Sequence, residues 1–449
     1  MILIFTKKIT TRLNFIFKLI FNDLLNIEYR LTEDKNEFLA SSSAKFNYSN
    51  IRIKDELFLE ANAILFEENI YEKDIQVFQF QKQKVFFLTK KDSFFHFDIF
   101  AASFYLISRY EEYLPFKKDK FGRFLAENSL ADKHDFLAEP IVNNWTELFK
   151  NELKKIFPQI DFPENQFSYI PTIDIDNAFA YKYKGYYRIF GALAKTLIDM
   201  NFGQFIDRIK VLLNLKNDPN NTYPFLHEIH NKHGFKAIFF FLLGNFNQYD
   251  RNIPVSNISF RKMINETSKK IAVGIHPSFA SNTNNEQLAN EVNTLSEITN
   301  MKIEKSRQHY LMLFFPQTYQ NLIKNGIKQD FSLGYAEKIG FRAGICSPFN
   351  FFDLSKNEET DLKIVPFQIM DVSLKNYLNL SADKSIEKIR EMIEKVEKVN
   401  GTFVSLWHNE SVNDIGTWKG WRRVYIEMIE YLSQISKQKS VSRNNNLKN

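Results

Sequence analysis

The stretch "SYIPTIDIDNAFA", residues 168–180, has the composition of a β-strand that ends in two carboxylates. Side chains alternate between the two faces of a strand, so Asp174 and Asp176 point to one side while Ile173 and Ile175 point to the other. Like charges held this close repel each other unless a cation or a shared proton lies between them. The stretch therefore predicts a strand that presents a charged site near its carboxyl end.

The chain has 449 residues, which is too long for one small core, and we expect two domains. Its 44% hydrophobic and 25% charged residues are ordinary for a soluble globular protein. The formal net charge of +6 is small for this length, which argues against nucleic-acid binding. The single cysteine, Cys346, excludes an intramolecular disulfide framework and fits a reducing compartment.

The first residues of the chain are apolar, but lysine and arginine interrupt them. This pattern indicates neither a cleavable signal peptide nor a transmembrane segment. From Leu13 to Leu24 the apolar residues have the spacing of an amphipathic helix, which we expect to pack on its own domain rather than on a membrane. We therefore expect a cytoplasmic protein.

Two prolines among polar residues mark a boundary near residues 155–167. Residues 1–160 are predicted to form a smaller domain of mixed α+β structure. Residues 165–435 alternate strand and helix, a pattern that predicts an α/β fold with a parallel sheet. Residues 436–449 are basic and lack periodicity, so we expect a disordered tail.

Polar side chains recur at the predicted strand ends, which is where ligands bind in folds of this kind. These residues are Asp174, Asp176, His276, Arg307, His309, Asp330, Arg342 and His408. Each has a structural explanation when taken alone, such as a buried histidine with one hydrogen bond, a helix cap or a surface ion pair. Their shared location indicates a common site.

Five stretches within residues 168–412 resemble the polysaccharide deacetylase (NodB-homology) family of metal-dependent de-N-acetylases. They are "TIDID" (172–176), "KAIFFFLLG" (236–244), "VGIHPS" (273–278), "RQHYLMLFFPQTYQNLIKNGI" (307–327) and "SLWHN" (405–409). The order and spacing of the stretches carry the resemblance.

The N-terminal stretch "FYLISRYEEYLPFKKDKFGRF" (104–124) is similar to an uncharacterised domain that precedes deacetylase-like domains in some bacterial proteins. It indicates no chemistry of its own. Its Arg109, Glu111 and Glu112 are expected to form an ion-pair cluster on a helix surface.

The resemblance implies a distorted (β/α) barrel with fewer than eight strands. It also implies a divalent metal, usually zinc, with manganese or cobalt as alternatives. Asp176 and His276 would bind the metal, and Asp174 would be the general base for the attacking water. His408 would protonate the leaving amine, and Arg307 would hold Asp174 ionised and oriented.

The family's second metal histidine falls four residues after the first, and Ala280 occupies that position here. Two protein ligands are fewer than a catalytic zinc site uses. Three alternatives follow: His309 supplies the missing nitrogen, an oxygen of a nearby loop side chain replaces it, or the metal is lost. The candidates for the oxygen are Ser278, Ser281 and Asn282.

We therefore expect a metal-dependent hydrolase that de-N-acetylates an amino sugar or a polysaccharide precursor. The side chains expected to contact this sugar are Trp407, Tyr310 and Arg342. The alternative function is carbohydrate binding without turnover on the same barrel, and His309 directed at His276 would favour the enzyme. A nucleotide-sugar glycosyltransferase that uses "DID" as its metal motif ranks last, because no glycine-rich phosphate loop precedes the acids.

Overall fold

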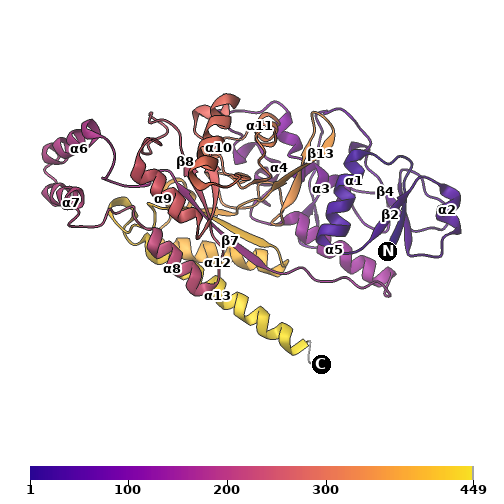
Figure 1. Cartoon of the computed structure of the whole chain (residues 1–449). Coiled ribbons are helices and arrows are strands. Elements are labelled where there is room, and N and C mark those ends of the chain that lie inside the picture. The colour runs from indigo at the N-terminus through magenta and orange to yellow at the C-terminus, as the bar shows by residue number, and fades with distance from the viewer. Residues whose placement is uncertain (447–449) are drawn as a thin grey trace.

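The computed structural model describes residues 1–446, with side chains through Lys439, and its elements form an elongated body (Figure 1). The N-terminal third contains a parallel sheet with the strand order β2-β1-β3-β4. Its strands are β1 (Ile2–Phe5), β2 (Tyr29–Thr32), β3 (Lys45–Ser49) and β4 (Phe58–Glu60), and a separate hairpin consists of β5 (Phe78–Phe80) and β6 (Gln83–Val85). The helices of this part are α1 (Thr11–Phe17), α2 (Lys35–Ala40), α3 (Ile99–Ile107), α4 (Leu130–Lys133) and α5 (Ile141–Ile156).

The amphipathic helix expected near the N-terminus is confirmed. Helix α1 begins after Thr10, whose side chain accepts a hydrogen bond from the backbone N–H of Leu13, and it continues into a π-helical turn over Lys18–Leu24. The Phe17 ring stacks on Phe100 of α3 with ring centroids 4.0 Å apart. The apolar face of this helix is therefore buried within the protein, where Phe17 packs on α3 and Phe15 packs on Phe352 of the C-terminal part.

The second sheet has the strand order β12-β13-β11-β10-β9-β8-β7-β15-β14, with parallel pairing throughout except between β12 and β13. Its strands are β7 (Ser168–Ile175), β8 (Ile238–Leu242), β9 (Ala272–His276), β10 (Lys305–Ser306), β11 (Gln329–Asp330), β12 (Phe349–Asp353), β13 (Glu358–Ile364), β14 (Ile369–Met370) and β15 (Thr402–His408). The predicted α/β class is confirmed. In the described residues the sheet is open, because β12 and β14 form its two edges and are not paired as a closed barrel requires.

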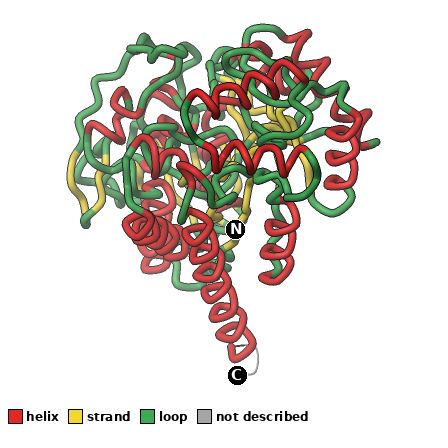
Figure 2. The backbone as a smooth tube through the Cα atoms, turned by 90° about the vertical axis from the view of Figure 1, so that its left-hand side faces the viewer, coloured by secondary structure: helices red, strands yellow, loops and turns green. Residues whose placement is uncertain are grey.

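Helices surround the central strands (Figure 2). In this part of the chain they are α6 (Tyr186–Ile198), α7 (Phe202–Leu212), α8 (Tyr223–His233), α9 (Ile258–Ser268), α10 (Asn285–Thr299), α11 (Gln317–Lys324), α12 (Ala382–Lys398) and α13 (Trp421–Asn446). The end of α13 leaves the body and runs on to Asn446, whereas a disordered tail was predicted from residue 436. Residues 447–449 of that predicted tail lie outside the described residues.

Alternate side chains of the central strands enter two different cores. Ile173 and Ile175 belong to the large core under the helices, whereas Phe240 and Val404 belong to a smaller cluster on the opposite face. Only glycine fits at Gly274 on this second face, because a Cβ atom there would lie 2.6 Å from the Phe240 ring. The smaller cluster supports the strand ends that carry the polar residues.

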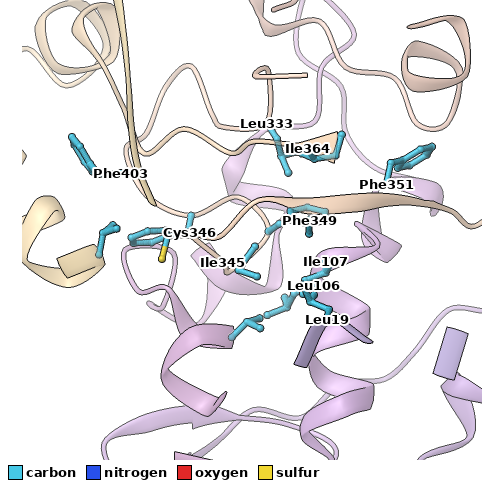
Figure 3. Packing of buried hydrophobic residues seen from close by; sticks show 14 of the residues in the cluster. Leu19, Leu106, Ile107, Leu333, Ile345, Cys346, Phe349, Phe351, Ile364 and Phe403 are labelled. Atoms are coloured by element: carbon cyan, nitrogen blue, oxygen red, sulfur yellow. The ribbon is translucent and has the colours of Figure 1, made fainter. Parts of the chain in front are cut away.

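The two parts of the chain share one hydrophobic core. Figure 3 shows Leu106 and Ile107 of α3 close to Ile345 and Phe349 of the C-terminal part, and all four belong to the same cluster of buried residues. Cys346 lies in this core, where burial raises the pKa of its thiol to about 12 and keeps it protonated. The domain boundary near residues 155–167 stays a prediction, because the parts of the chain before and after it share one core.

A buried ion cluster joins the two parts. The Glu112 carboxylate accepts from Arg109 Nε at 2.7 Å and from Arg342 Nη2 at 2.6 Å, and Arg109 also pairs with Glu111 at 2.9 Å. All four side chains are buried, so the expectation of a helix-surface cluster is wrong. Arg342 was predicted to contact substrate, but its guanidinium is held by Glu112 and by the carbonyl of Gly334. It spans the domain junction instead.

We predict that Glu112→Ala destabilises the protein by about 3–5 kcal/mol, because it leaves two buried guanidinium groups without their shared carboxylate. Urea unfolding monitored by circular dichroism measures this change. The matched control is Glu391→Ala, which removes the partner of Lys388 in a partly exposed ion pair and should cost about 0–1 kcal/mol. Equal, small losses in both variants would contradict a structural role for the buried cluster.

Candidate metal centre

The carboxyl ends of the parallel strands surround a cavity of about 200 Å³. Asp174 lies on β7, Asp176 follows that strand directly, and His276 and His408 are the last residues of β9 and β15. His309 lies in the short turn after β10. The complete lining is Arg123, Asp174, Asp176, His276, Gln308, His309, Tyr310, Leu311, Ala336, Met370, Val372, Tyr377, Leu406 and His408. The structure thus brings together five of the groups that the sequence placed at strand ends.

Three of these side chains form a group that could hold a metal ion. His276 Nε2 lies 3.1 Å from Asp176 Oδ1, and His309 Nε2 lies 3.6 Å from Asp176 Oδ2. The two imidazole rings have centroids 4.9 Å apart. One ligand atom from each of the three residues lies within 4.8 Å of the other two. Two imidazoles and one carboxylate make a set of three protein ligands, as catalytic zinc sites use.

The second nitrogen of each of these imidazoles is already occupied. His276 Nδ1 is hydrogen-bonded to the backbone carbonyl of Arg307, and His309 Nδ1 lies 2.8 Å from a carboxylate oxygen of Asp250. With the proton on Nδ1, the Nε2 lone pair of a neutral ring is free to bind a metal ion, and both Nε2 atoms face Asp176. Such outer hydrogen bonds orient the histidines of metal sites. The residues present therefore fit a divalent cation.

Charge is concentrated around Asp176. Burial alone would raise the pKa of its carboxyl, but the charge of His309 and hydrogen bonds from His276 and His309 hold it well below its usual range. Burial alone would lower the pKa of His309, but Asp176 and Asp250 raise it to about 9. At neutral pH His309 therefore carries a positive charge that offsets part of the negative charge of the two carboxylates.

The loop after His276 places no side-chain oxygen in the wall of the cavity. Ala280 begins a short 3-10 turn, and the oxygen candidates Ser278, Ser281 and Asn282 do not line the cavity. Ser281 Oγ donates to the backbone carbonyl of Ser278 at 2.8 Å, and the Asn282 amide donates to the same carbonyl at 3.3 Å. Of the three alternatives left open by the sequence, the geometry favours His309.

Asp174 lies beside this group. Its Oδ2 atom is 3.8 Å from His276 Nε2 and 3.9 Å from Arg307 Nη1, while its Oδ1 atom is buried without a hydrogen-bond partner. The Arg307 guanidinium is fully buried between the rings of Phe240 and Phe367, and Nη2 donates to Thr172 Oγ1 at 2.7 Å. An arginine held this rigidly keeps a positive charge directed at the carboxylate.

His408 completes the polar wall from the other side. Its Nε2 atom lies 3.6 Å from Asp176 Oδ2, and its Nδ1 atom lies 2.8 Å from Asp371 Oδ1. Asp371 also accepts a hydrogen bond from the backbone N–H of His408. Burial alone would lower the pKa of His408, but the Asp371 carboxylate raises it well above its usual range.

Sequence analysis missed two carboxylates, Asp250 and Asp371, that orient histidines of the site. Asp371 directly follows strand β14, so its position at a strand end was a usable signal. Asp250 lies in the long loop after β8, where no regular pattern fixes its position. Asp330, which was singled out, instead lies behind Arg307 and accepts a hydrogen bond from Ser306 at 2.7 Å.

Of the three side chains expected to contact a sugar, only Tyr310 lines the cavity. Tyr310 and Leu311 both have positive φ angles, 56° and 54°, a backbone strain that is common at functional sites. Trp407 is fully buried and packs on Tyr425 with ring centroids 4.9 Å apart. The prediction for Trp407 is wrong because neighbouring residues on a strand face opposite sides, and His408 faces the cavity.

The N-terminal domain contributes to the cavity wall, which the sequence did not indicate. Arg123 lines the cavity and donates from Nη1 to the carbonyl of Tyr310 at 2.7 Å, while Asp119 holds its Nε atom at 2.8 Å. In the same loop, the ring of Phe121 packs on Tyr310 at a centroid distance of 5.1 Å. The candidate site is therefore built from both domains.

Residues 2–158 match the model of a family of unknown function (DUF7033). Among curated proteins, none matches the chain. Solved structures that resemble it at low sequence identity include polysaccharide deacetylases and a pseudoenzyme of the CE4 family.

One is a candidate polysaccharide deacetylase from Mycobacterium smegmatis, at 13% identity and a TM-score of 0.38, covering 61% of this chain and 86% of that chain. A CE4 family pseudoenzyme from Bacillus anthracis has 13% identity and a TM-score of 0.30, with 62% of this chain and 63% of that chain covered. The polysaccharide deacetylase Bc1974 from Bacillus cereus has 13% identity and a TM-score of 0.28, with 61% of this chain and 88% of that chain covered.

We predict that the protein binds one divalent metal ion and that His276→Ala and His309→Ala each abolish stoichiometric binding. Asp250→Asn removes the carboxylate that orients His309, and it should weaken the affinity for the metal ion about 10–100-fold without abolishing binding. Isothermal titration with Zn²⁺, supported by elemental analysis, measures both effects. His96→Ala, at an exposed histidine of the N-terminal domain, is the matched control and should bind as the wild type does. Unchanged binding in His309→Ala would exclude this residue as a ligand.

Proposed function

We propose that this protein is a metal-dependent hydrolase that removes the N-acetyl group from an amino sugar or a polysaccharide precursor. The observation that carries the proposal is the convergence of Asp176, His276 and His309 in a cavity that also contains Asp174 and His408. A set of metal-competent side chains flanked by a carboxylate and an imidazole suits metal-assisted hydrolysis of an amide. The five sequence motifs that resemble polysaccharide deacetylases support the same reaction.

Asp176, His276 and His309 would hold the metal, and zinc suits this combination of two imidazoles and a carboxylate, with manganese or cobalt as alternatives. When bound, such a metal acts as a Lewis acid toward the amide carbonyl and makes water more acidic. The chain itself would supply the proton transfers.

Asp174 would take a proton from the attacking water. Its Oδ1 atom has no partner within the protein, and Arg307 directs positive charge at its other oxygen. His408 would give a proton to the leaving amine from Nε2, while Asp371 holds the opposite side of the ring and fixes its orientation. The buried Arg307 is a positioning residue, because it acts through Asp174.

The cavity lining suits the acyl end of an acetamido sugar. Leu311, Ala336, Met370 and Leu406 supply an apolar surface to which an acetyl methyl group could bind. The volume of about 200 Å³ is small, so it fits the reacting group and part of one sugar ring rather than a long segment of polymer. Arg123, Tyr310 and Tyr377 provide polar groups for sugar hydroxyls.

The test is the release of acetate from N-acetylated amino sugars by the metal-loaded protein. Asp174→Asn should reduce kcat by about 10²–10⁴-fold, because it removes the base while leaving the metal ligands in place. Metal content is measured in parallel and should remain at the wild-type level. Asp199→Asn, at an exposed aspartate, is the matched control and should keep full activity.

Carbohydrate binding without turnover is the second candidate, and Ala280 at the position of the family's second metal histidine is the feature that favours it. That function predicts binding of acetylated sugars, measured by titration, with no acetate released under any metal. Acetate release that Asp174→Asn abolishes would exclude it.

We further predict that Arg123→Ala lowers kcat/KM by about tenfold or more, mainly through KM, because it removes a charged hydrogen-bond donor from the cavity wall. The matched control is Lys117→Ala, which removes an exposed lysine six residues before Arg123 and should leave kcat and KM unchanged. Steady-state kinetics with the best acetylated substrate provides the measurement. An Arg123→Ala variant with wild-type kinetics would show that the N-terminal domain does not contact substrate.

A further inference from the structure

The helical hairpin α6–α7 stands apart from the rest of the body (Figure 1, left). Its two helices pack on each other, and Thr196 and Val211 are the buried residues that belong to them. Half of the large apolar side chains that are exposed in the described part of the chain lie within residues 183–215. A concentration of this kind on a monomer marks an interaction surface.

Several of these exposed apolar side chains are almost fully accessible to solvent. Tyr187 is 97% exposed, Ile198 at the end of α6 is 79% exposed, and Met200 in the turn between the two helices is 78% exposed. The other exposed apolar residues of the hairpin are Tyr183, Tyr186, Phe190, Leu197, Phe202, Ile206, Leu213 and Leu215. The hairpin thus combines aromatic and aliphatic groups on the outside of a projecting element.

The same segment carries most of the net charge of the protein. Residues 182–216 contain seven basic and two acidic side chains, a charge of +5, while the whole chain has +6. The basic residues are Lys182, Lys184, Arg188, Lys195, Arg208, Lys210 and Lys216. Lys195 and Lys210 are exposed on the two helices, and Arg188 covers the exposed ring of Phe246 at 3.8 Å.

The base of the hairpin is fixed to the candidate site. The buried Asp218 carboxylate accepts hydrogen bonds from the backbone N–H groups of Ala180, Tyr181 and Lys182. The amide of Asn220 donates to the carbonyl of Asn177, the residue that follows Asp176. The hairpin therefore leaves the body at the same strand end that carries the two acids, and its orientation is set there.

We propose that the α6–α7 hairpin docks this protein on the surface of an anionic lipid bilayer. Exposed tyrosine, phenylalanine, isoleucine and methionine side chains would enter the interface, and the lysine and arginine side chains would pair with acidic headgroups. In the described residues, no helix is both long and apolar enough to cross a membrane, so the contact is peripheral. This inference is independent of the proposed hydrolase activity.

A second copy of the chain is the competing occupant of this surface. Two hairpins facing each other would bring charges of +5 and +5 together, which repel, whereas an anionic bilayer offers the complementary charge. Charge complementarity is therefore the reason to favour the lipid surface over self-association.

Co-sedimentation with vesicles tests the proposal. The wild type should pellet with phosphatidylcholine vesicles that contain 30% phosphatidylglycerol and remain in solution with pure phosphatidylcholine, with binding weakened at high salt.

Lys195→Glu combined with Lys210→Glu should weaken binding at least 25-fold, because each cation near such a surface strengthens binding about fivefold. Phe190→Ser combined with Ile198→Ser and Phe202→Ser should also abolish it. All five residues are exposed, so the variants should keep the wild-type circular dichroism spectrum.

The matched controls lie on the N-terminal domain. Ile51→Ser with Leu88→Ser, and Lys54→Glu with Lys91→Glu, change exposed residues of the same types and should bind vesicles as the wild type does. Failure of the wild type to bind either vesicle, or equal loss in the control variants, would overturn the proposal. A wild-type dimer that the serine variant converts to a monomer, without vesicle binding, would assign the surface to a second copy instead.

Discussion

The charge on Asp176 is the constraint on which the organisation of the site depends. This carboxylate sits where parallel strands converge, and three histidines direct Nε2 atoms toward it at 3.1–3.6 Å. A buried carboxylate needs compensation, either by protonated imidazoles or by a cation. Each histidine has a fixed partner on its other nitrogen, so the arrangement persists as a rigid set rather than as three independent side chains.

Around this set the negative and positive groups alternate. Asp250 and Asp371 lie behind His309 and His408, and Arg307 lies behind Asp174. These outer groups hold the inner ones by hydrogen bonds and charge, which is how preorganised sites keep their geometry without substrate. Such a network is costly in a buried region unless its members are paired.

The two domains form one structural unit. Hydrophobic residues of α3 share a core with the C-terminal domain, the Glu112 carboxylate joins arginines from both sides, and Arg123 reaches the wall of the cavity. The match of residues 2–158 to a family of unknown function therefore concerns a domain that helps to form the candidate site. The sequence separates the domains by composition, but the fold joins them through burial and ion pairing.

The sequence by itself determined the α/β class, the alternation of strands and helices, and the common location of Asp174, Asp176, His276 and His408. These follow from the period of two along a strand and from the fact that parallel strands end at one edge of a sheet. The same rule of alternation places Trp407 away from the cavity, and it could have been applied at the outset. Only the tertiary structure placed His309 rather than the loop oxygens beside Asp176, held Arg342 at the junction of the two parts of the chain, and brought Arg123 and Asp250 to the site. Those contacts join segments far apart in the chain, and no local pattern of residues records which distant loops will meet.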